Sequence, residues 1–121
     1  MLEVQPLMQP PGAIVYGWDP QAEVSAQDRT EILRGLRLYQ VLMFHKHAPP
    51  GDKDLTHFAA SFGDLVKGSE WFGEIGDYAE ILPVHNLVDD DGVPLGTGAS
   101  AALAWHTDYS YLPTLGQESF F

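Results

Sequence analysis

The feature that most constrains this chain is the stretch Trp105-His106-Thr107-Asp108-Tyr109-Ser110-Tyr111, with His106-x-Asp108 at its centre. In an extended strand, residues i and i+2 point to the same face, so the imidazole and the carboxylate would project side by side. Such a pair supplies two of the three ligands in the 2-His-1-carboxylate triad of non-haem Fe(II) oxygenases. Three-residue patterns also arise by chance, and the alternative is a surface His and Asp in a loop. We therefore predict a strand over 101–112 that carries two metal ligands.

The residues around this pair resemble a known family. Trp-His-Thr-Asp followed by aromatic and hydroxyl residues is similar to the metal-binding motif of the taurine dioxygenase and 2,4-dichlorophenoxyacetate dioxygenase family (TauD/TfdA). A second stretch carries the same resemblance: a helix beginning at Ser25-Ala26, a strand ending in Leu42-Met43-Phe44, and a helix running through 58–65. The resemblance extends from about Gly12 to Phe121.

Local signals predict four elements in the first half of the chain. A strand is expected over 12–18, and a helix from the N-cap Ser25 through Tyr39, with apolar residues at helical spacing. The apolar run 41–44 predicts a buried strand, and a second helix is expected between the N-cap Asp54 and the terminating Gly63. The Pro-rich residues 1–11 are expected to form a loose N-terminal arm.

The second half predicts strands at 81–88, at 101–112 and from Glu118 onward. Asp91-Gly92 is a hairpin signal, and the acidic run 89–91 fits a solvated turn because it lacks the spacing of a calcium-binding EF-hand loop. Trp105 and Tyr109 alternate with the metal pair and are expected to pack in the core.

The resemblance implies a mixed α+β fold: an incomplete double-stranded β-helix (jelly roll) with the N-terminal helices packed outside. Residues 12–121 would form the N-terminal part of a family domain, truncated before a distal His ligand and an Arg that pairs with 2-oxoglutarate. No His follows His106 and no Arg follows Arg37. Loss of a bidentate guanidinium–carboxylate pair costs on the order of a few kcal/mol. Little or no turnover is expected from these residues alone.

The composition limits which classes of binding partner, location and domain organisation are expected. The net charge of −11 argues against nucleic acid or an anionic membrane surface as a partner. The chain has no cysteine and no apolar run long enough to span a bilayer, which favours a cytoplasmic location. At 121 residues the chain is at most one domain, and an oligomer is left open. No Lys or Arg follows Lys67, so the second half is acidic. This one-sided charge predicts that this half is incomplete, or that it binds a metal ion or a basic partner.

The resemblance implies Fe(II) as the metal, with 2-oxoglutarate and dioxygen as co-substrates and a small organic molecule as the substrate. His106 and Asp108 would hold the iron. Related halogenases have a small residue at the carboxylate position, so Asp108 points to hydroxylation or another oxidation. Four further residues are candidates for substrate binding, although Trp71 has core packing as its alternative: Trp71, His85, Asn86 and Ser110.

Two other functions remain open. The chain could be a non-catalytic remnant, or a module that a partner completes. It could also be a metal hydrolase that uses His85 together with His106 and Asp108 and needs no 2-oxoglutarate. The pair His45-x-His47 has metal-ligand spacing, but it precedes a Pro-rich turn and is expected to be solvent-exposed.

Overall fold

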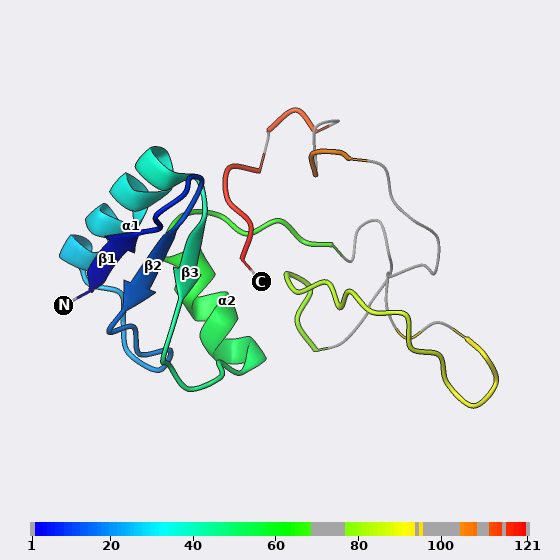
Figure 1. The fold of residues 1–121 in the computed structure, drawn as a ribbon. Coiled ribbons are helices and arrows are strands. Elements are labelled where there is room, and N and C mark those ends of the chain that lie inside the picture. The colour runs from blue at the N-terminus through cyan, green and yellow to red at the C-terminus, as the bar shows by residue number, and fades with distance from the viewer. Residues whose placement is uncertain are drawn as a thin grey trace. The chain divides into compact units, whose positions relative to one another are not determined.

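The computed structural model describes residues 2–68, 77–93, 95, 105–108, 112–114 and 116–120. The chain divides into two units, residues 1–63 and residues 64–121. Within the described ranges, all helices and strands belong to the first unit, which is a small mixed α/β structure (Figure 1). Neither of its helices is long and apolar enough to cross a membrane.

A three-stranded sheet organises the first unit, in the order β1-β2-β3. Strand β1 (Glu3–Pro6) pairs antiparallel with β2 (Ala13–Tyr16), and β2 pairs parallel with β3 (Leu42–Phe44). Strand β2 confirms the strand predicted over 12–18.

Strand β1 shows that the prediction of a loose arm was wrong. Residues 3–6 pair with β2 in a continuous register from Glu3↔Tyr16 to Pro6↔Ala13. The proline at the end of β1 costs the pairing nothing, because the alternation of the ladder turns its missing N–H away from β2. Beyond it, Leu7 N–H donates to Gly12 O at 3.0 Å, which closes the connection between the two strands.

Helix α1 (Ala26–Tyr39) confirms the predicted first helix and its cap. The Ser25 hydroxyl oxygen accepts from the Asp28 backbone N–H at 3.1 Å, and the Ser25 hydroxyl donates to the Asp28 carboxylate at 2.8 Å. The other Asp28 oxygen accepts from Leu2 N–H at 3.2 Å, so the cap also ties the chain before β1 to the helix. The helix ends where Gln40 adopts a positive φ of 66°.

Replacing Ser25 by alanine is expected to lower the free energy of unfolding by about 1 kcal/mol, the usual cost of losing an N-cap acceptor. Chemical denaturation followed by circular dichroism measures the change. Ser25→Thr keeps a hydroxyl acceptor and is the control, so its loss should be clearly smaller. Equal losses in the two variants would show that the cap oxygen contributes little.

Helix α2 (Asp52–Ala60) confirms the second helix but shifts both of its ends. Gly51 occupies the N-cap position, and the Asp54 carboxylate accepts from Gly51 N–H at 3.3 Å from within the first turn. Asp54 therefore stabilises the helix start from inside and does not cap it, because a carboxylate can reach the free N–H groups from either place. The C-cap is Ser61, two residues before the predicted Gly63.

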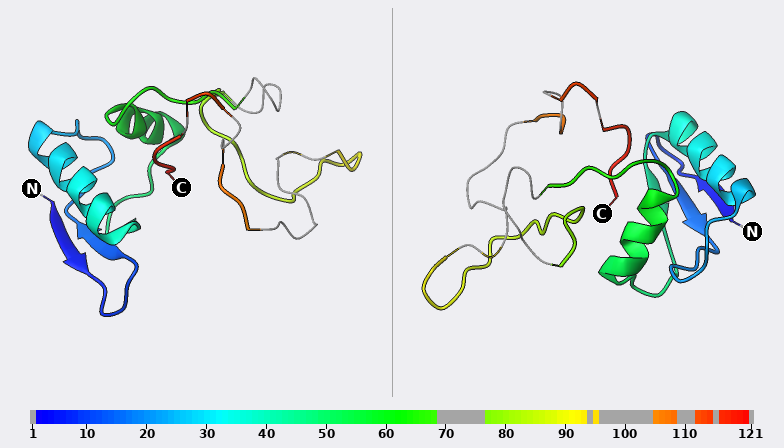
Figure 2. Two further views of the ribbon diagram at one scale, coloured as in Figure 1. Left: turned by 90° about the horizontal axis from the view of Figure 1, so that it is seen from above. Right: turned by 180° about the vertical axis from the view of Figure 1, so that it is seen from behind.

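The core lies between the sheet and the two helices. Figure 2 shows α1 along one face of the sheet, where Gly35 allows the close approach: a Cβ there would lie 3.2 Å from Leu42 Cδ1 and 3.7 Å from Val4 Cγ1. The largest fully buried side chains are Ile32 and Val15. An aromatic cluster joins α2 to the sheet: Trp18, Phe44, Phe58 and Phe62.

Strand β3 is less buried than its apolar sequence predicted. Met43 is 54% exposed and the preceding Val41 is 55% exposed. Because β3 is an edge strand with helix α1 over only one sheet face, alternate side chains face the uncovered side.

The described residues of the second unit contain no extended strand. The predicted strands at 81–88 and from Glu118 onward are wrong, since residues 81–87 and 116–120 have no regular structure and only Val88 forms an isolated bridge. The acidic turn is confirmed: Gly92 N–H donates to Asp89 O at 3.0 Å, and Leu95 N–H donates to Leu87 O at 3.0 Å across the hairpin. A strand needs a neighbour for its backbone groups, and an apolar sequence alone does not supply one.

Candidate metal site

The predicted ligand pair lies together. His106 Nε2 is 3.1 Å from Asp108 Oδ1, and the two side chains are 55% and 58% exposed. Residue Trp105 lies in a bend and Asp108 in a turn, and none of residues 105–108 is in a strand, so the expected strand geometry was wrong at this point. A turn also brings residues i and i+2 together, and both side chains remain open to solvent.

The spacing of the two donor atoms fits a shared metal ion. Two ligands at about 2.1 Å from an octahedral ion, at a right angle, lie about 3.0 Å apart. One imidazole nitrogen and one carboxylate oxygen are also the donor types that the 2-His-1-carboxylate triad uses. The same distance suits a direct hydrogen bond between the two side chains. The pair can therefore pass from a mutual contact to shared coordination with little movement.

A third ligand is not found among the described residues, which contain no group of three His, Asp or Glu side chains able to hold a metal ion. His85 is half-buried, and its Nδ1 is buried without a hydrogen-bond partner in the described part of the chain. It does not join His106 and Asp108 in such a group, so the geometry gives no support to a hydrolase built on these three residues.

The other sequence candidates lie apart from this pair or outside the description. Asn86 is exposed. Trp71 and Ser110 lie outside the described residues, as does Tyr109. Trp105, which was expected to pack in the core, is instead 105% exposed. The indole is therefore open to solvent, as are the two candidate ligand side chains.

The two histidines that follow β3, His45 and His47, pack against aromatic rings. His45 is exposed, as predicted, and its ring packs edge-on against Tyr16 with centroids 5.7 Å apart. His47 is only half-exposed, because its ring stacks edge-on against Trp18 at 4.7 Å. Each of the two imidazole rings therefore has an aromatic packing partner.

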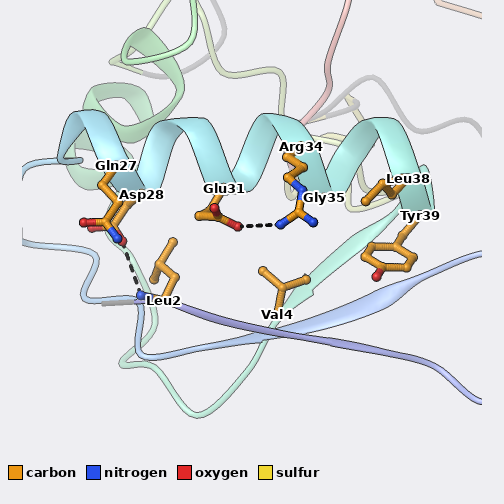
Figure 3. Close-up of a pocket in the computed structure, with 9 residues that line it drawn as sticks. All are labelled: Leu2, Val4, Gln27, Asp28, Glu31, Arg34, Gly35, Leu38 and Tyr39. Atoms are coloured by element: carbon orange, nitrogen blue, oxygen red, sulfur yellow. Dashed lines mark hydrogen bonds and ion pairs between the residues drawn. The ribbon is translucent and has the colours of Figure 1, made fainter.

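The sequence did not reveal a groove of about 320 Å³ between α1 and β1 (Figure 3). Its lining is partly apolar, with Leu2, Val4 and Leu38. Two polar contacts lie within it: Arg34 Nη1 is 3.4 Å from Glu31 Oε2, and Asp28 accepts from Leu2 N–H. The glycine at position 35 within an otherwise apolar helix stripe is the one sequence signal for this groove. Nothing in the groove resembles the chemistry of the His–Asp pair.

Residues 3–121 match the family described as "Taurine catabolism dioxygenase TauD, TfdA family". The chain is 35% identical over 109 residues to pentalenolactone F synthase of Streptomyces avermitilis, covering 90% of this chain and 36% of that protein. It is 34% identical over 120 residues to pentalenolactone F synthase of Streptomyces arenae, covering 98% of this chain and 40% of that protein. The chain thus spans about two fifths of the length of these relatives.

A solved structure agrees with the family. The crystal structure of a candidate alpha-ketoglutarate-dependent taurine dioxygenase from Burkholderia xenovorans is similar with a TM-score of 0.58 and 29% identity, over 66% of this chain and 28% of that chain. The similarity to family members is therefore found in the fold as well as in the sequence. The chain therefore belongs to the TauD/TfdA family of 2-oxoglutarate-dependent dioxygenases.

Proposed function

We propose that this chain contributes His106 and Asp108 as two of the three iron ligands of an Fe(II)- and 2-oxoglutarate-dependent dioxygenase. The observation that carries the proposal is the 3.1 Å separation of His106 Nε2 and Asp108 Oδ1 in a family member. An iron ion held by these residues would, with 2-oxoglutarate and dioxygen, supply the chemistry for oxidising a C–H bond in a small organic substrate. The carboxylate of Asp108 fills the position that halogenases leave for a halide, which favours hydroxylation or a related oxidation.

The roles of the two side chains differ. His106 offers a neutral nitrogen donor and Asp108 an anionic oxygen donor, and together they neutralise part of the ion's charge and leave the remaining coordination positions free for co-substrates. The exposure of both side chains leaves the ion a direct route from solvent. His85 and Asn86, with Trp71 and Ser110, are proposed to contact the substrate.

The remaining parts of the site are proposed to lie outside these 121 residues. A distal His would complete the triad, an Arg would pair with the far carboxylate of 2-oxoglutarate, and further strands would complete a jelly roll with the N-terminal helices outside it. Without them, the isolated chain is expected to bind metal weakly and to turn over little substrate. A non-catalytic remnant is the competing function.

Anaerobic calorimetry with Fe(II) tests the proposal. The parent chain is expected to bind one ion per chain, and His106→Ala/Asp108→Ala is expected to lose that binding. Loss of a residue that only orients a metal ligand already weakens affinity by about 10–100-fold, and this variant removes both proposed ligands. The titration is repeated in the presence of 2-oxoglutarate, which should tighten the binding if open coordination positions exist.

A matched control separates the site from general attraction of cations to an acidic chain. His57→Ala/Asp77→Ala removes one exposed imidazole and one exposed carboxylate elsewhere, at the same change in charge. It should bind Fe(II) like the parent. Parent binding no tighter than that of the His106→Ala/Asp108→Ala variant would refute the ligand assignment and favour the remnant.

A further inference from the structure

We draw no further inference here: the strongest candidate, the groove of about 320 Å³ between α1 and β1, lies in a chain that spans about two fifths of its relatives, and nothing in the structure shows what covers it.

Discussion

Replacing Phe58 by alanine is expected to remove a large share of the stability of the first unit. Phe58 is 4% exposed and is the centre of the aromatic cluster, with its ring 4.7 Å from that of Trp18, 5.5 Å from that of Phe44 and 5.2 Å from that of Phe62. Truncating a buried Phe to Ala costs about 3–5 kcal/mol through lost transfer energy and the cavity that remains. A unit of this size has roughly 3–9 kcal/mol in total.

Tryptophan fluorescence and far-UV circular dichroism during urea denaturation would measure this loss. Phe58→Leu, which keeps most of the buried volume, is the control and should lose clearly less stability. If Phe58→Ala unfolds at the same urea concentration as the parent, α2 does not contribute to the stability of the sheet.

The second large effect is expected at Ile32, the buried anchor of α1. Ile32→Ala should lower the free energy of unfolding by about 2–5 kcal/mol, since the side chain is 1% exposed and its loss leaves a cavity against the sheet. Leu38→Ala is a matched control on the same helix. Leu38 is 57% exposed, so its truncation should change the free energy by less than about 1 kcal/mol.

Both variants are measured by the same urea denaturation. Alanine has the highest helix propensity, so a lower helix propensity cannot explain a decrease in the free energy of unfolding of either variant. Similar losses at the two positions would contradict the packing of α1 described above.

The sequence predicted the first unit well where the signal was local. The Ser25 cap, the apolar spacing through Tyr39 and the short apolar run before His45 each correspond to an observed element. The failures were interactions between distant residues. Strand β1 forms because β2 pairs with it, and no local pattern in the Pro-rich residues 1–11 predicts that pairing. Likewise, the exposure of Met43 follows from its place on an edge strand, which no local pattern specifies.

At the candidate site, too, local features could be predicted and features that depend on distant residues could not. The proximity of His106 and Asp108 could be predicted, because only one residue separates them and most backbone conformations without a helix bring them near each other. The strand that was expected to present them was wrong, since a strand depends on a neighbour that the described residues do not contain. Core packing of Trp105 failed for the same reason. The proposed third ligand and the proposed substrate contacts would depend on distant residues, which local sequence patterns do not predict.

The adjacency of the two ligands has an energetic consequence for how such a site assembles. Chelation of one ion by His106 and Asp108 would close a very short loop, so the chain would lose little conformational entropy when both donors turn to that ion. A ligand from a distant segment must close a far longer loop, and that cost is recovered only when the ion binds. In the proposed site, the local pair would bind the metal ion first, and the bound ion would then favour coordination by the distant ligand. Metal supply and completion of the fold would be thermodynamically linked in a protein built this way.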